Sequence, residues 1–142
     1  MKIQRSASAL WKGGIKDGKG EISTGSGALA AYPYGFASRF EGVAGTNPEE
    51  LLAAAHAGCF TMALSLMLTE AGLVPAELAT KADVTLEKME SGFQITTVKL
   101  TLTAKVPGAS AQQFQDLANK AKLNCPLSKV LRADISLVAT LA

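Results

Sequence analysis

The sequence predicts one α+β domain over residues 1–142, with the element order β-β-β-α-β-β-α-α-β. Three observations lead to this prediction. Residues 51–69 form an apolar stretch without Asp, Glu, Lys or Arg, which indicates a long core helix. Residues 98–106 alternate between apolar and polar side chains, which indicates a strand with one buried face. Hydrophobic residues make up 48% of the chain, which is ordinary for a globular domain of this length.

The N-terminal part of the chain is rich in glycine and predicts short strands. Ser6–Trp11 and Glu21–Thr24 are expected strands, joined by a turn at residues 16–20. Residues 32–35 are expected to form a loop, and Ala37–Glu41 a short third strand.

The central helix has clear signals at both ends. Asn47 is a suitable N-cap, Pro48 suits the first helical position, and acidic residues follow in the first turn. We expect the helix to run to about Ala71 and to stop at Gly72. Because it is apolar almost all the way round, it must be covered by its own sheet or by a second subunit.

A membrane span is the alternative for this stretch. A spanning helix needs about 20 strongly apolar residues. The stretch instead contains His56, Gly58, Thr61 and Ser65, so we interpret it as a buried core helix.

The second half of the chain predicts a hairpin. Ala82, Val84 and Leu86 alternate with polar residues, as residues 98–106 do, and a turn is expected at residues 90–92. Phe93 and Ile95 fall on the opposite parity to Val98 and its successors, which predicts a bulge near residues 96–97.

The last elements alternate between helix and strand. Ser110–Leu123 is an expected helix with Ser110 as its cap. Cys125 and Pro126 open a further helical turn through Leu131, and Asp134–Leu141 alternates as a final strand.

Composition and charge exclude some functions. With 14 basic and 12 acidic residues, the net charge is only +2, and the basic residues are scattered, so neither nucleic acid nor a membrane surface is an expected partner. The first ten residues lack the apolar core of a signal peptide, so we expect a cytoplasmic protein. In a reducing compartment, cysteines are more often catalytic than structural.

The two cysteines are the candidate reactive groups. Cys125 is expected at a helix N-cap, where backbone N–H groups favour a thiolate. Cys59 lies in the apolar helix, where burial raises the pKa of a thiol unless a cation is delivered to it. The residues alone therefore favour Cys125 as the more reactive thiol, and Arg39 is the best-placed cation for Cys59.

His56 precedes Cys59 by three positions and shares its helix face. A Cys–His nucleophile pair is one interpretation, although no third orienting group is evident. The cysteines and histidine lack the spacing of a zinc site, so we expect no metal and no cofactor.

At this point the chain resembles the OsmC/Ohr family of hydroperoxide reductases, and more closely its OsmC branch. The resemblance spans essentially the whole chain and rests on four motifs: Pro33-Tyr34-Gly35-Phe36, Arg39-Phe40-Glu41-Gly42, residues 45–60 (GTNPEELLAAAHAGCF) and Asn124-Cys125-Pro126-Leu127-Ser128.

The resemblance implies a role for each candidate residue. Cys59 matches the peroxidatic cysteine and Cys125 the resolving one, which reverses the ranking made from the residues alone. Arg39 matches the arginine that holds the first thiolate, and Glu49 the acid that pairs with it. Residues 11–16 lack the arginine of the Ohr branch, which favours the OsmC branch.

The resemblance also implies a reaction and an assembly. Cys59 would reduce an organic hydroperoxide, and Cys125 would close a disulfide that an external dithiol, of lipoyl type in the family, reduces again. An OsmC-like fold and an intertwined homodimer with sites at its interface are expected, as is a link to osmotic or oxidative stress.

One spacing bears on the dimer. Glu49 and Cys59 are ten residues apart, a rise of about 15 Å on a straight helix. Either the helix breaks near its start, or Glu49 serves the Cys59 of a second chain.

Two other functions remain open on the sequence. A general thiol–disulfide oxidoreductase would use the same cysteines without preferring alkyl hydroperoxides. A non-enzymatic binder of apolar molecules would keep its ligand affinity after Cys59→Ser.

Overall fold

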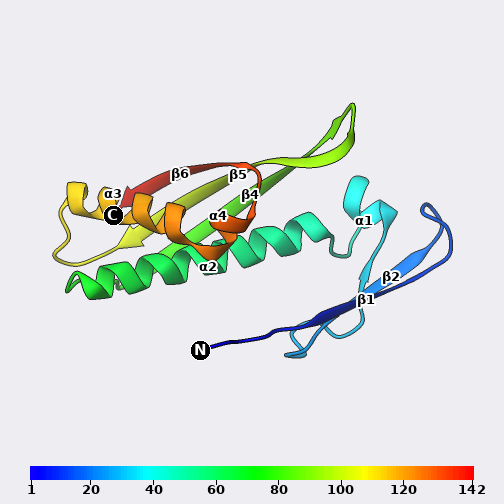
Figure 1. The fold of residues 1–142 in the computed structure, drawn as a ribbon, viewed down its shortest axis with the longest axis horizontal. Coiled ribbons are helices and arrows are strands. Elements are labelled where there is room, and N and C mark those ends of the chain that lie inside the picture. The colour runs from blue at the N-terminus through cyan, green and yellow to red at the C-terminus, as the bar shows by residue number, and fades with distance from the viewer. The chain divides into compact units, whose positions relative to one another are not determined.

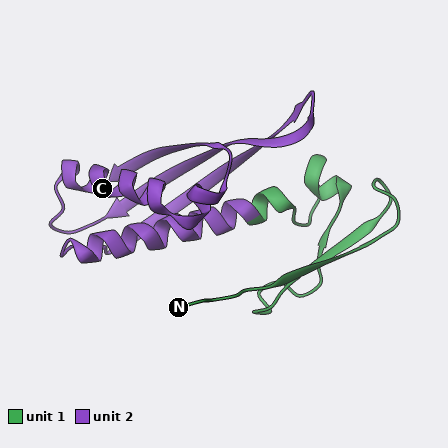
Figure 2. Ribbon diagram, viewed as in Figure 1, with its two compact units in different colours: residues 1–51 green, residues 52–142 purple.

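The computed structural model describes all residues from 1 to 142 and divides into two compact units, residues 1–51 and residues 52–142 (Figure 2).

The first unit contains a small antiparallel sheet. Its strands are β1 (Ala7–Lys12), β2 (Lys19–Thr24) and β3 (Tyr32–Tyr34), with β2 in the middle. Gly20 is buried on β2, and a Cβ atom there would overlap the ring of Tyr34. Glycine is therefore needed at this position because the aromatic ring occupies the space of a side chain.

The prediction for residues 32–41 is wrong in its details. The third strand is β3 (Tyr32–Tyr34), where a loop was expected, and α1 (Phe36–Phe40) is a short helix where the strand Ala37–Glu41 was expected. The physical reason is local. The hydroxyl of Ser38 accepts the Gly35 N–H at 2.9 Å and closes the first turn of α1. The rings of Phe36 and Phe40, four positions apart, pack in a tilted arrangement with centroids 4.9 Å apart, as the helical period allows.

The long helix α2 (Pro48–Glu70) begins and ends as predicted. The side chain of Asn47 accepts the N–H of Glu50 at 2.8 Å, which is the expected N-cap contact. Gly72 has a φ of +77°, and the N–H of Leu73 donates to the carbonyl of Leu68 at 2.9 Å. The left-handed Gly72 and the hydrogen bond from Leu73 to Leu68 form a Schellman motif, which ends the helix.

The burial of α2 within a single chain is confined to one face. Its fully buried side chains recur every four residues on one face: His56, Phe60, Leu64 and Leu68. By length and composition α2 could cross a membrane, and only 22% of its most apolar window is buried within the chain. Within a single chain the prediction of a buried central helix therefore holds for one face, and cover of the remaining surface by a second subunit stays a prediction.

The second unit is built on another sheet. Its strands are β4 (Glu77–Met89), β5 (Gly92–Lys105) and β6 (Asp134–Leu141), with β5 central, antiparallel to β4 and parallel to β6. The predicted bulge is confirmed, because Thr85 lies opposite Thr97 and Leu86 lies opposite Ile95, which leaves Thr96 as the extra residue.

The parallel connection from β5 to β6 contains the helices α3 (Ala111–Asn124) and α4 (Pro126–Val130). Ser110 caps α3 as predicted, since its hydroxyl accepts the N–H of Gln113 at 3.1 Å. In Figure 1 the three strands lie side by side, with α2 along one face of the sheet. Buried side chains of α2, α3 and β5 form one apolar core, which includes Phe60, Leu64, Val98, Leu100, Leu102, Phe114 and Ala118.

Candidate active site

The two cysteines are neighbours in the folded second unit. They are 66 positions apart in the sequence, yet the thiol of Cys125 donates to the sulfur of Cys59 with the two Sγ atoms 2.8 Å apart. Both thiols are free, Cys125 is fully buried and Cys59 is partly exposed. The sulfurs, at 2.8 Å, would have to approach by less than about 1 Å to reach the S–S bond length of about 2.05 Å.

Cys125 is held by the backbone on both sides. Its N–H donates to the carbonyl of Ala121 at 2.9 Å, which ends α3, and its carbonyl accepts the N–H of Lys129 at 3.2 Å, which starts α4. Pro126 occupies the first helical position of α4, where no backbone N–H is needed. The sulfur of Cys125 therefore projects from a corner that two helix ends define.

The surroundings of Cys59 oppose its ionisation. Burial raises the pKa of the Cys59 thiol, and the neighbouring Cys125 thiol adds to the rise. The backbone N–H of Leu127 donates to the Cys59 sulfur and lowers the pKa only in part. Within its own unit, Cys59 thus lacks the cation that a thiolate in apolar surroundings requires.

The arginine and the acid predicted for the site are paired in the first unit. The guanidinium of Arg39 binds the carboxylate of Glu49 with two hydrogen bonds, Nη2–Oε1 at 2.7 Å and Nε–Oε2 at 3.2 Å. This two-pronged geometry orients the plane of the guanidinium. The Arg39 side chain is 35% exposed and lies 5.2 Å from the ring centroid of Phe40.

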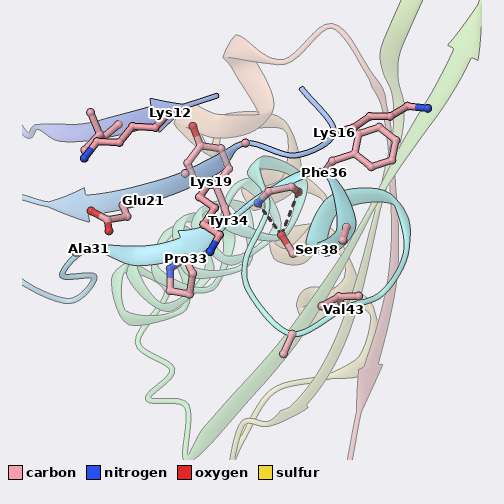
Figure 3. A pocket seen from close by; sticks show the side chains of 16 residues that line it. Lys12, Lys16, Lys19, Glu21, Ala31, Pro33, Tyr34, Phe36, Ser38 and Val43 are labelled. Carbon is pink, nitrogen blue, oxygen red and sulfur yellow. Dashed lines mark hydrogen bonds between the residues drawn. The ribbon is translucent and has the colours of Figure 1, made fainter. Parts of the chain in front are cut away.

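Ser38 fixes the turn that carries Arg39. Figure 3 shows its side chain with hydrogen bonds to Gly35, and its hydroxyl also donates to the carbonyl of Thr46 at 2.9 Å. The side chain of Asn47 donates to the Ser38 carbonyl at 3.4 Å. These bonds join α1 to the start of α2, so that Arg39 and Glu49 face each other.

A small cavity of about 270 Å³ lies beside Arg39 in the first unit. Aromatic and apolar side chains form most of its wall: Trp11, Ile15, Tyr34, Phe36, Phe40 and Pro48. A larger cavity of about 700 Å³ in the same unit is lined by Lys12, Lys16 and Lys19 and contains neither Arg39 nor a sulfur (Figure 3).

Sequence reasoning missed the partner of His56. Its Nε2 atom is 2.8 Å from the hydroxyl of Ser128 on α4, so the ring pairs with a serine and not with Cys59. Burial lowers the pKa of the fully buried ring, and its Nδ1 atom has no hydrogen-bond partner. Ser128 follows Cys125 by three positions, just as Cys59 follows His56, and this matched spacing is the signal that could have found it.

Comparison with known proteins places the chain in a family. Residues 40–139 match the family model described as OsmC-like protein. The chain is 54% identical over 137 residues to Peroxiredoxin OsmC of Escherichia coli (strain K12), with 96% of both chains covered. It is 35% identical over 99 residues to an organic hydroperoxide resistance protein of Xanthomonas axonopodis pv. citri, covering 69% of this chain and 68% of the relative.

Solved structures share the fold. The crystal structure of the organic hydroperoxide resistance protein OhrB of Bacillus subtilis matches with a TM-score of 0.68 and 30% identity, covering 96% of this chain and 98% of that one. An organic hydroperoxide resistance protein OsmC from Legionella pneumophila matches with a TM-score of 0.74 and 25% identity, covering 98% and 99%. The chain therefore belongs to the OsmC-like protein family, with an α+β fold built around a long central helix.

Proposed function

We propose that this protein is a thiol-dependent peroxidase that reduces organic hydroperoxides to alcohols through Cys59 and Cys125. The observation that carries the proposal is the 2.8 Å separation of the two free thiols. The relatives' names, peroxiredoxin and organic hydroperoxide resistance protein, support the same reaction.

The reaction begins at Cys59. Its thiolate attacks one oxygen of the peroxide bond, the O–O bond breaks, and the alcohol leaves after taking up a proton. Cys59 is now a sulfenic acid. The sulfur of Cys125 displaces its hydroxyl group, which leaves as water with the thiol proton, and a Cys59–Cys125 disulfide remains. An external dithiol, for which a lipoyl group is the family-based candidate, reduces this disulfide through a mixed disulfide.

Arg39 supplies the missing positive charge in this proposal, and Glu49 orients its guanidinium. A cation near a thiolate lowers the pKa of the thiol by favouring its charged form. The raised pKa of Cys59 within its own unit is the reason that such a cation is needed.

The site is proposed to form between two chains. Helix α2 is continuous from Pro48 to Glu70, so no break shortens the rise of about 15 Å between Glu49 and Cys59. Two such helices packed antiparallel around a twofold axis bring the start of one near the middle of the other. The exposed apolar side chains of α2, among them Met62 and Leu66, support a second copy as their cover.

The surroundings of Arg39 and Cys59 bear on the class of substrate. The apolar wall beside Arg39 and the apolar residues around Cys59 favour alkyl or fatty-acid hydroperoxides over hydrogen peroxide. We propose a cytoplasmic protein in which residues 1–142 act as one functional domain, with neither nucleic acid nor membrane as a partner.

Anaerobic titration with cumene hydroperoxide tests the reaction. The reduced wild type is expected to lose both thiols of each chain at one equivalent of peroxide and to form an internal disulfide. Cys125→Ser is expected to react at Cys59 but to proceed to sulfinic acid with excess peroxide. Cys59→Ser is the matched control and is expected to consume no peroxide.

Two outcomes would contradict the proposal. Persistence of both wild-type thiols at stoichiometric peroxide would exclude a peroxidase. Rapid exchange with disulfides, without faster consumption of cumene hydroperoxide than of hydrogen peroxide, would indicate a general thiol–disulfide oxidoreductase.

A further inference from the structure

Two polar side chains next to the thiols take no part in the mechanism above. His56 is fully buried on α2, and Ser128 lies on α4 with its hydroxyl 2.8 Å from the Nε2 atom of the ring. The Nδ1 atom of the same ring is buried without a hydrogen-bond partner. Burying an unpaired polar atom costs free energy, so an apolar side chain would serve packing alone better than this histidine does.

The contact between His56 and Ser128 is a second link between α2 and α4, in addition to the contact between the two thiols. His56 precedes Cys59 by three positions, and Ser128 follows Cys125 by three. Because residues three apart lie on the same helix face, the two contacts are stacked one turn apart. The two links together fix both the distance and the rotation of α4 relative to α2.

The two links differ in how they respond to oxidation. The thiol–thiol contact, and the hydrogen bond from the Leu127 N–H to the Cys59 sulfur, both depend on the state of Cys59. When Cys59 becomes a sulfenic acid, its sulfur carries an oxygen and these contacts change. The link between His56 and Ser128 contains no sulfur, so it does not depend directly on the oxidation state of Cys59.

Helix α4 needs such a link because it has only five residues. A helix this short is not stable by itself, since nucleation of a helix is unfavourable and few hydrogen bonds follow it. Movement of α4 would carry Cys125, its N-cap, away from Cys59. Closure of the disulfide depends on the fraction of time that the two sulfurs spend in attack geometry.

We propose that His56 and Ser128 are positioning residues that keep Cys125 within attack distance of Cys59 after the peroxide has reacted. This inference rests on the proposed peroxidase function. In the step concerned, the Cys125 sulfur forms a bond to the Cys59 sulfur, the S–O bond of the sulfenic acid breaks, and water leaves with the thiol proton. The peroxide has already supplied the oxidation, so no further oxidant is required.

Single-turnover kinetics of the full chain separate the two steps. Reduced protein is mixed with stoichiometric cumene hydroperoxide, and sulfenic acid and disulfide are followed by trapping and mass spectrometry. In Ser128→Ala we expect disulfide closure to slow by about three- to tenfold, the effect of one lost hydrogen bond. The peroxide step should change by less than about twofold. Sulfinic acid at Cys59 should increase with excess peroxide.

Two conservative variants and one control complete the series. Ser128→Thr keeps the hydroxyl and is expected to close the disulfide faster than Ser128→Ala. His56→Gln keeps a polar atom near the Nε2 position and is expected to close it faster than His56→Leu, which removes the polar atom. Thr69→Ala removes a hydroxyl that bonds to the Ser65 carbonyl at the far end of α2, and it should match the wild type.

A second measurement needs no peroxide. The equilibrium of the Cys59–Cys125 disulfide with glutathione reports the effective concentration of the two thiols, and Ser128→Ala should weaken the disulfide by a similar factor of about three to ten. Wild-type closure rates and equilibrium constants in Ser128→Ala would overturn the proposal. Equal slowing of both kinetic steps would also overturn it, because this indicates a general structural role. If the wild type fails to react with peroxide, the peroxidase function fails, while the glutathione equilibrium still tests the positioning role.

Discussion

At the residue scale, the reactivity of Cys59 depends on groups that lie far from it in the sequence. Burial and the neighbouring Cys125 raise the pKa of its thiol, and the Leu127 N–H offsets only part of the rise. Sequence reasoning recognised that Cys59 requires a cation, because an apolar helix was evident. It missed Leu127 and Ser128 as contacts of the site, because their positions depend on how α4 docks against α2.

Removal of the arginine is predicted to change the pH dependence of the peroxide step. Arg39→Ala leaves the pKa of Cys59 raised, so less thiolate is present at neutral pH. A shift of one to three pH units corresponds to a loss of about ten- to a thousandfold in rate below the pKa. Because the thiolate fraction increases with pH until the pKa is passed, the deficit should shrink in alkaline solution.

Stopped-flow rates between neutral and alkaline pH check this prediction. Arg5→Ala is the matched control, since Arg5 is exposed and bonds only to the Gln4 carbonyl. A pH profile of Arg39→Ala that superimposes on that of the wild type would show that Arg39 does not act on Cys59.

At the scale of elements, the helix ends were predicted correctly, whereas the elements between residues 32 and 41 were not. Asn47 and Ser110 each accept an N–H from three positions further on, and the left-handed Gly72 allows the nearby bond from Leu73 to Leu68, so the ends of α2 and the start of α3 could be predicted. The strand β3 depends on pairing with β2. Its central residue, Pro33, is a type that is rare inside strands, so the sequence favoured a loop there. Helix α1 depends on Ser38, whose role in the turn is visible only in the structure.

The cap of α3 has a predicted energetic value. Ser110→Ala removes the acceptor of the Gln113 N–H and should lower the free energy of unfolding by about 1 kcal/mol. Ser110→Asp keeps an acceptor and should stay near the wild type. Urea unfolding measures both, with the strand residue Ser136→Ala as a control. A fully stable Ser110→Ala would mean that the cap contributes nothing to the fold.

At the scale of the whole molecule, the exposed apolar surface of α2 is the feature that a single chain leaves unexplained. Ala54, Gly58, Met62 and Leu66 recur every four residues, and all four are exposed. The sequence indicated that the helix needs a cover but left open whether its own sheet or a second subunit provides it. The structure assigns one face to the sheet, and our proposal assigns the other to a second copy.

Mixed dimers provide a test of sites shared between chains. At neutral pH, Cys59→Ser alone is expected to be inactive and Arg39→Ala alone to be strongly impaired. If Arg39 of one chain serves Cys59 of the other, each dimer with one chain of each variant has one intact site. Random reassortment of the two variants should therefore restore about a quarter of all sites. Recovery of peroxidase activity after joint refolding is the measurement. Activity that stays at the level of the separate variants, in dimers shown to have exchanged, would place Arg39 and Cys59 of one site in the same chain.

The long sequence separation of the two thiols has a consequence for heat tolerance. A disulfide between Cys59 and Cys125 would close a loop that contains β4, β5 and α3 and whose ends are 66 positions apart in the sequence. Closing so large a loop restricts the unfolded chain and would stabilise the oxidised fold by about 4 kcal/mol. We therefore expect calorimetry to find a higher melting temperature after peroxide treatment, with the difference abolished in Cys125→Ser. A catalyst of this design would be most resistant to unfolding while it awaits its reductant.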